Sequence, residues 1–179
     1  MPAQPARARM SDKLRQKAGR LNPLLEVTVI GEQGTSKLAR CAATASRRGD
    51  VICLWGDLGI GKTVFARAFI RALGDPEAEV PSPTFTLVQM YGPFAAIGCP
   101  LHHFDLFRIE DPADIRELGF EDAVVDGVVL VEWPDRLGPL LPASRLDIRF
   151  AAAGHPDGRQ ITFGGDAGWE LRLRRACGD

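Results

Sequence analysis

Residues 56–63, GDLGIGKT, have the spacing of glycine, lysine and threonine that is typical of a phosphate-binding loop. Such glycines let the backbone bend closely, so that main-chain N–H groups point at phosphate oxygens. We expect Lys62 to reach the β- and γ-phosphates and the Thr63 hydroxyl to ligate Mg²⁺. The predicted nucleotide-binding residues are Gly59, Ile60, Gly61, Lys62, Thr63 and Val64.

The surroundings of this loop are those that a phosphate site needs. A short apolar run at 51–55 precedes it and predicts a strand, and residues 62–73 follow with apolar side chains at helical spacing. The N-terminus of that helix adds a positive dipole end. The alternative is a glycine-rich turn in which Lys62 is merely solvated, and the full motif in its required context disfavours it.

A second candidate is Glu132, which ends the apolar run VVLVEW. A strand of this kind, buried on both faces, belongs in a parallel sheet. At the carboxyl end of a strand beside the loop, a carboxylate can hold Mg²⁺ directly or through water. The alternative is a surface glutamate at a strand end; the phosphate-binding loop favours the metal role.

Two further stretches carry chemistry. In HHFDLF, strand alternation places His103 and Asp105 on one face and His102 on the other. Asp105 is a candidate to orient the attacking water or a water on Mg²⁺; alternatively it bonds a turn or pairs with Arg108. In PSPTFTL, the prolines stiffen the segment before Thr84, which either closes over the γ-phosphate or is a plain turn leading into a strand.

The remaining pattern predicts an α/β protein. We expect strands at 24–30, 84–91, 101–107 and in GVVLVEW, a helix over 35–48 capped by Thr35 or Gly34, and a short helix in DPADIRELG. The stretches RLDIRFAAA and GRQITFGG predict a closing hairpin, and GWELRLRRA fits a strand or a helix equally. Together these predict a three-layer P-loop NTPase-like fold with a mixed, mainly parallel sheet flanked by helices.

Length and composition fit one domain. The 179 residues are 45% hydrophobic, the net charge is −1, and four scattered cysteines read as buried or free thiols in a reducing cytosol. We assign 1–22 to a flexible basic arm and 23–179 to a single P-loop domain. The arm is either a solvated extension, a segment that touches RNA, or a transit peptide, and Met10 is an alternative start. The sequence contains no apolar run of about 18 residues, so we expect no membrane span.

The motifs GDLGIGKT, SPTFTL, HHFDLF with Arg108, ELGFED and VEWPDRL together resemble the bacterial TsaE (YjeE) family, in the family's order and over about residues 26–137. The resemblance implies that Lys62 and Thr63 hold phosphate and Mg²⁺, that Glu132 and Asp105 are the catalytic acids, and that 32–35 approach the base. Ile60, Val64 and Phe107 depart from the usual alanine, threonine and tyrosine of that family.

The resemblance further implies a function. The family is the P-loop ATPase of tRNA threonylcarbamoyladenosine biosynthesis, so the expected cofactors are ATP and Mg²⁺. The expected partners are TsaD-like and TsaB-like proteins, with tRNA contacted indirectly through the complex, in the cytoplasm and without a membrane. We expect weak hydrolysis without partners, because no arginine is an evident preformed finger; Arg108 and Arg136 are candidates.

Other classes of nucleotide-binding protein remain as alternatives. A regulatory GTPase needs an N-K-x-D motif, and the single asparagine of the chain, Asn22, excludes that route to guanine. A small-molecule kinase of the P-loop class shares the loop but needs an acceptor pocket and usually an arginine-rich lid, which the sequence does not show. A nucleotide-dependent scaffold without significant hydrolysis is the third possibility.

Overall fold

The computed structural model describes residues 22–178, so the predicted arm at 1–22 lies, apart from Asn22, outside the described residues. The elements, in chain order, are β1 (Asn22–Ile30), α2 (Gly31–Ala45), β2 (Val51–Trp55), α3 (Lys62–Leu73), β3 (Val88–Phe94), β4 (Cys99–Asp105), α4 (Pro112–Glu117), α5 (Phe120–Asp126), β5 (Val128–Glu132), the 3₁₀ helix η1 (Pro134–Leu140), β6 (Leu146–Ala152), β7 (Gly158–Gly165) and α6 (Ala167–Cys177).

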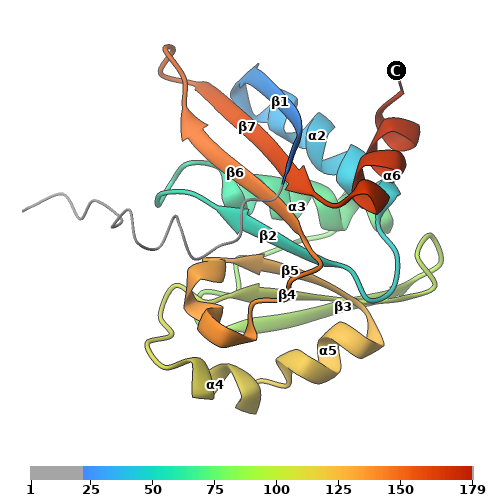
Figure 1. Ribbon diagram of the computed structural model, residues 1–179, viewed down its shortest axis with the longest axis vertical. Helices are drawn as coiled ribbons and strands as arrows, with labels where there is room; N and C mark the ends of the chain where they lie inside the picture. Colours follow the sequence, from blue (N-terminus) through green and yellow to red (C-terminus); the bar gives the residue numbers. More distant parts are fainter. Residues whose placement is uncertain (1–21, 179) are drawn as a thin grey trace, which may run out of the picture.

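The strands form one mixed sheet in the order β1-β7-β6-β2-β5-β4-β3 (Figure 1). The four strands in its middle, β6, β2, β5 and β4, run parallel to one another. Antiparallel pairs, β1 with β7, β7 with β6, and β3 with β4, complete the two edges. The predicted P-loop NTPase-like fold with a mixed sheet is therefore confirmed.

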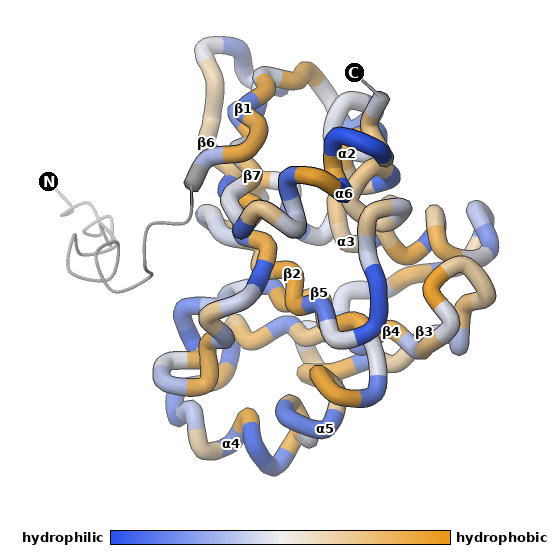
Figure 2. Tube along the Cα trace, turned by 45° about the vertical axis from the view of Figure 1, so that its right-hand side comes forward, coloured by the Kyte–Doolittle hydropathy of each residue, from blue (hydrophilic) through white to orange (hydrophobic). Residues whose placement is uncertain are grey.

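Strand β2 shows why the fold has three layers. All five of its side chains are buried, because helices cover the sheet on both faces. Ile52 and Leu54 pack in a core shared with α2, α3 and α6. Val51, Cys53 and Trp55 point to the other face, where α4, α5 and η1 provide a second core. Figure 1 shows the two groups of helices on opposite sides, and Figure 2 shows hydrophobic residues along β2 in the middle of the fold.

Several predicted boundaries are wrong. Helix α2 begins at Gly31, not at Thr35 or Gly34, because the Gly31 N–H is held by the Asp157 carbonyl oxygen at 3.0 Å and the helix starts directly after β1. It ends at Ala45 rather than Arg48, since Ser46 is extended.

The strand predicted at 84–91 is the second error. Strand β3 begins only at Val88, because Leu87 has a positive φ of 64° and its N–H bonds the Pro83 oxygen, which closes a turn. The strand predicted at 101–107 ends at Asp105. The helix α5 was not predicted, and GWELRLRRA is resolved as the helix α6, whose N-cap Asp166 accepts a hydrogen bond from the Trp169 N–H.

The closing hairpin is confirmed as β6 and β7. All four cysteines lie in the described part of the chain and are free thiols. Among residues 22–178, no helix combines the length and the apolar character that crossing a bilayer requires.

Candidate functional site: a phosphate-binding loop facing two strand-end carboxylates

The loop predicted to bind phosphate connects β2 to α3, as the motif requires. Gly61 is the N-cap of α3 and has a φ of 116°, which side-chain-bearing residues rarely adopt. Gly56 starts the loop at a φ of 144°, and a Cβ atom there would lie 2.8 Å from the Phe150 backbone oxygen on β6. Glycine is therefore needed at both positions. Gly61 is required for its backbone conformation, and Gly56 is required for its conformation and for lack of space.

Lys62 lies inside this loop instead of extending into solvent. Its Nζ donates to the backbone oxygens of Gly56 at 2.7 Å and Asp57 at 2.8 Å, and only 4% of the residue is exposed. The ammonium also lies 3.9 Å from the ring centroid of Trp133, within cation–π range. Burial lowers the pKa of Lys62 from its ordinary value, and the Glu132 and Asp105 carboxylates oppose that shift. The solvated-lysine alternative is wrong for this structure.

Glu132 faces the loop from the neighbouring strand β5. Its Oε2 accepts a 2.9 Å hydrogen bond from the Thr63 hydroxyl, and the residue is only 2% exposed. The pairing of β5 with β2 sets Glu132 opposite Leu54, one residue before the strand end at Trp55. The alternative of a surface glutamate is therefore also wrong.

His103 forms a hydrogen bond to the other carboxylate oxygen of Glu132. Its Nε2 lies 3.1 Å from Glu132 Oε1, and the imidazole is completely buried. A carboxylate only accepts, so the imidazole donates from Nε2. Its Nδ1 has no hydrogen-bond partner among the described residues. Glu132 is thus held at both oxygens, by Thr63 on the loop side and by His103 on the sheet side.

Asp105 ends β4, directly opposite Glu132 in the register of the two parallel strands. Its Oδ2 accepts from the hydroxyls of Ser82 at 3.0 Å and Thr84 at 2.7 Å, while Oδ1 accepts from the Phe107 N–H at 3.1 Å. The alternative in which Asp105 bonds a turn is therefore realised at both of its oxygens, because Thr84 and Phe107 each lie in a turn.

The suggested pairing of Asp105 with Arg108 is not found among the described residues. The Arg108 guanidinium instead lies 4.3 Å from the ring centroid of Phe85. Asp105, Ser82 and Thr84 all line the cavity between the loop and the strand ends.

These side chains surround one cavity of about 270 Å³. Its lining residues are Leu58, Gly59, Gly61, Lys62, Thr63, Val64, Ser82, Thr84, Asp105, Phe107, Glu132 and Trp133. Of the residues predicted to bind phosphate or Mg²⁺ or to act as catalytic acids, all except Ile60 line it. Ile60 lines an adjoining hollow of about 170 Å³ together with Gly31, Glu32, Thr35 and Arg159, the direction in which 32–35 were expected to meet a base.

Sequence reasoning missed some of the residues that build this cavity. Trp133, in the left-handed region at a φ of 62°, covers Lys62, and Ser82 shares Asp105 with Thr84. The Arg159 Nε donates to the Ile60 oxygen at 2.9 Å and so braces the loop from β7. The position of Trp133 directly after Glu132 could have marked it as a site residue from the sequence. No local pattern points to Arg159.

A buried strand, a glycine loop, a helix and an acid at the end of the adjacent parallel strand define a P-loop nucleotide-binding protein. The sequence model of the family described as "Threonylcarbamoyl adenosine biosynthesis protein TsaE" matches residues 30–161. The chain belongs to this TsaE family.

Individual relatives agree with the family assignment. The "tRNA threonylcarbamoyladenosine biosynthesis protein TsaE" of Bacillus subtilis is 38% identical over 140 residues, which cover 78% of this chain and 84% of that protein. The protein of the same name from Rickettsia conorii is 36% identical over 125 residues, 70% of each chain. The crystal structure of Bacillus subtilis YdiB aligns with a TM-score of 0.70 and 28% identity, covering 87% of this chain and 95% of that one.

Proposed function

We propose that this chain binds ATP with Mg²⁺ in the cavity and hydrolyses it slowly, as the ATPase of threonylcarbamoyladenosine formation in tRNA. It acts in the cytoplasm with TsaD-like and TsaB-like partners, which hold the tRNA. The observation that carries the proposal is the 2.9 Å contact between the Thr63 hydroxyl and Glu132, because it joins the loop's metal ligand to a strand-end acid. The names of the relatives supply the pathway.

The residues present fit a magnesium ion. Mg²⁺ in phosphoryl-transfer sites uses one or two carboxylates plus the phosphates, not an all-protein cage. The donor set here is one hydroxyl, on Thr63, and one buried carboxylate, on Glu132. Within residues 22–178 no group of three or more histidine, cysteine or acidic side chains forms a complete metal site, which agrees with a metal held jointly by protein and nucleotide.

Each side chain then has a distinct task. Lys62, which now donates to two carbonyl oxygens, would donate to phosphate oxygens instead, and the main-chain N–H groups from Gly59 to Val64 would surround them. Thr63 and Glu132 would hold the metal, which would supply positive charge to neutralise the phosphates. Asp105, which lines the cavity opposite Glu132, would orient the attacking water.

The lining of the cavity supports the proposal of slow turnover in the isolated chain. Among the described residues, no arginine lines it. Arg136 donates its Nη1 to the Ile109 oxygen at 3.0 Å, and Arg108 lies on Phe85, so neither is poised over the phosphates. An arginine supplied by a partner accelerates hydrolysis by about 10³- to 10⁵-fold in P-loop enzymes.

The test uses the full chain and its native host. Purified protein is expected to bind ATP with Mg²⁺ in preference to GTP, Lys62→Ala is expected to lose binding, and Glu132→Gln to keep binding but lose turnover. Glu117→Gln, on the distant helix α4, is the matched control. Depletion of the protein is expected to remove threonylcarbamoyladenosine from bulk tRNA, with recovery by the wild type and not by Lys62→Ala.

Each part of the proposal can fail separately. Unchanged threonylcarbamoyladenosine after depletion refutes the pathway but leaves the nucleotide site. Nucleotide binding without any turnover, even in the presence of the partners, makes the chain a scaffold. Transfer of the γ-phosphate to a small acceptor makes it a kinase.

A further inference from the structure

The net charge of the chain hides a strong separation of charge across the sheet. On one face, α2 carries two basic side chains and one acidic one. Helix α3 carries two basic side chains, besides the buried Lys62 of the loop, and no acidic one, and α6 carries three basic side chains and one acidic one. On the opposite face, α4 carries one basic and two acidic side chains, α5 none and three, and η1 one and one. The layer of α2, α3 and α6 is therefore basic and the other layer is acidic.

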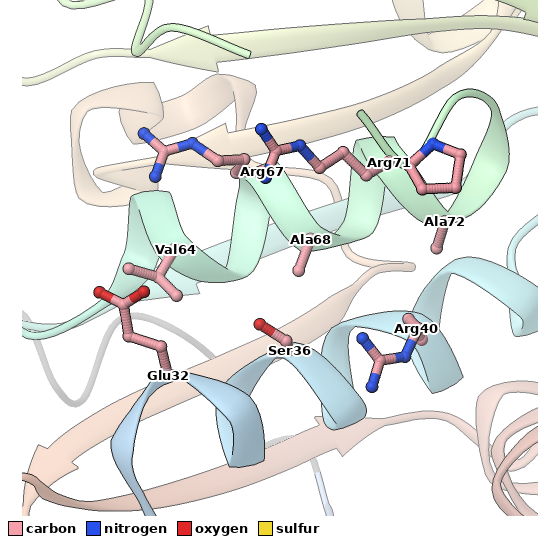
Figure 3. A pocket seen from close by; sticks show the side chains of 9 residues that line it. Glu32, Ser36, Arg40, Val64, Arg67, Ala68, Arg71 and Ala72 are labelled. Carbon is pink, nitrogen blue, oxygen red and sulfur yellow. The ribbon is translucent and has the colours of Figure 1, made fainter. Parts of the chain in front are cut away.

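The basic layer contains a groove between α2 and α3 with a volume of about 310 Å³ (Figure 3). Its floor consists of small apolar side chains, among them Ala68 and Ala72 of α3. Arg40 of α2 and Arg67 and Arg71 of α3 contribute its guanidinium groups. The groove begins beside Val64, which also lines the nucleotide cavity, and so continues from that site along the helices.

The two arginines of α3 are held in place without being neutralised. The Arg67 Nε donates to the Val80 oxygen at 3.2 Å, and the Arg71 Nε donates to the Ala78 oxygen at 2.9 Å. Each anchor uses only Nε, so the terminal amino groups remain for another acceptor. The two residues are one helical turn apart, about 6 Å along the axis.

Four acidic side chains lie near the groove, but none of them pairs with these arginines. Glu32 lines one end of the groove, and Asp75, Glu77 and Glu79 follow α3 near its other end. Within residues 22–178, no carboxylate lies within 4.0 Å of the guanidinium of Arg40, Arg67 or Arg71. The groove thus offers unpaired positive charge at fixed positions, which is the requirement for an anionic ligand.

We propose that this groove binds the phosphodiester backbone of tRNA directly. The idea rests on the proposed function for its choice of RNA, and extends it, because there the partners alone hold the RNA. Guanidinium forks above a shallow floor of small side chains suit successive phosphates. A protein partner would need deep apolar pockets for anchoring side chains, and alanines and Pro76 do not form them.

Arg40→Glu is the most direct test. Arg40 is exposed, and its side chain makes no hydrogen bond within the described residues, so its replacement leaves the fold intact. Arg116→Glu, on α4 of the acidic layer, changes the net charge equally and is the matched control. The full chain is titrated with fluorescently labelled bulk tRNA at several salt concentrations. ATP binding is measured on the same samples.

Wild-type protein and Arg116→Glu are expected to bind tRNA alike. Arg40→Glu is expected to weaken binding by about three- to tenfold and to reduce the slope of log affinity against log salt by about one, with ATP affinity unchanged. Equal weakening by both variants, or no tRNA binding by the wild type at low salt, overturns the proposal. Polyglutamate that competes as well as RNA at equal charge also overturns it, in favour of an acidic protein ligand.

This result is separable from the proposed function. If Arg40→Glu leaves tRNA binding unchanged while Lys62→Ala abolishes threonylcarbamoyladenosine formation, the groove assignment is wrong and the ATPase assignment stands. If depletion leaves the modified nucleoside unchanged, the pathway is wrong whatever the groove binds.

Discussion

Replacing His103 by leucine tests whether Glu132 must be held from the sheet side for metal binding. The imidazole is fully buried, and its Nε2 lies 3.1 Å from Glu132 Oε1. Leucine fills a similar volume but cannot donate a hydrogen bond, so Glu132 keeps only the contact from Thr63. The carboxylate is then less well positioned where the metal has to bind.

The size of the effect follows from the two contacts. A hydrogen bond to a buried charged group contributes about 1.5–3 kcal/mol. Part of this free energy appears as a loss of folding stability in the variant, because the protein makes the His103–Glu132 hydrogen bond without a ligand as well. Residues that orient a metal ligand typically change metal affinity by about 10- to 100-fold, so His103→Leu is expected to raise the Mg²⁺ concentration for half-maximal ATP hydrolysis by that factor.

The assay separates positioning from simple damage. Hydrolysis is measured over a range of Mg²⁺ at saturating ATP, together with nucleotide binding without metal and the melting temperature. His103→Gln, which restores an N–H at a similar reach, is expected to recover most of the Mg²⁺ affinity. His102→Leu is the matched control, because that neighbouring imidazole points to the other face, 3.7 Å from Asp126.

An unchanged Mg²⁺ requirement in His103→Leu would refute the reasoning. So would an equal shift in His102→Leu, because the effect would then come from loss of a histidine in β4 and not from the contact with Glu132. Loss of metal-free nucleotide binding along with Mg²⁺ binding would show that the loop itself had been disturbed.

Three further predictions concern the scaffold. Gly56→Ala is expected to cost about 1–3 kcal/mol of stability by urea denaturation, since its Cβ would lie 2.8 Å from a backbone oxygen, whereas Gly154→Ala, with open space, changes little. Arg172→Ala is expected to cost about 1–3 kcal/mol in thermal unfolding, because it leaves the largely buried Asp50 carboxylate without its bidentate partner, and Arg172→Lys recovers only part. Burial raises the pKa of Cys53 above the 9.0 of an ordinary thiol, so its stabilisation is complete below pH 9 and falls above it by about 1.4 kcal/mol per pH unit. In Cys53→Ala, the decrease in folding free energy above pH 9 is expected to be smaller by about 1.4 kcal/mol per pH unit. Plots of folding free energy against pH that run parallel for the two proteins between pH 8 and 10 would contradict the argument.

The sequence predicted the site where its geometry is local or follows from sheet order. The conformation of the loop 56–63 can be predicted from its own residues, because glycines at fixed positions allow the required φ angles. Glu132 was placed correctly because an uninterrupted apolar run marks a central parallel strand, and the carboxyl ends of such strands meet at one edge. Alternation along β4 likewise placed His103 and Asp105 on the same face.

The errors come from contacts between residues far apart in the chain. Residues 84–87 have the composition of a strand, but Thr84 bonds to Asp105, which is 21 residues later, and Leu87 turns the chain before β3. The start of α2 at Gly31 depends on a carbonyl of Asp157, from the hairpin between β6 and β7. Periodicity reports which side chains are apolar, and carries no information about such pairings.

The polar groups of the cavity satisfy one another before any ligand arrives, and this decides how binding must work. Lys62 donates to two carbonyl oxygens, the Thr63 hydroxyl donates to Glu132, and the Thr84 hydroxyl donates to Asp105. A ligand therefore exchanges hydrogen bonds, and its net gain is far smaller than the gross energy of its contacts. A ligand group that binds Oδ2 of Asp105 has to compete with the hydroxyls of Ser82 and Thr84, which already donate to that oxygen.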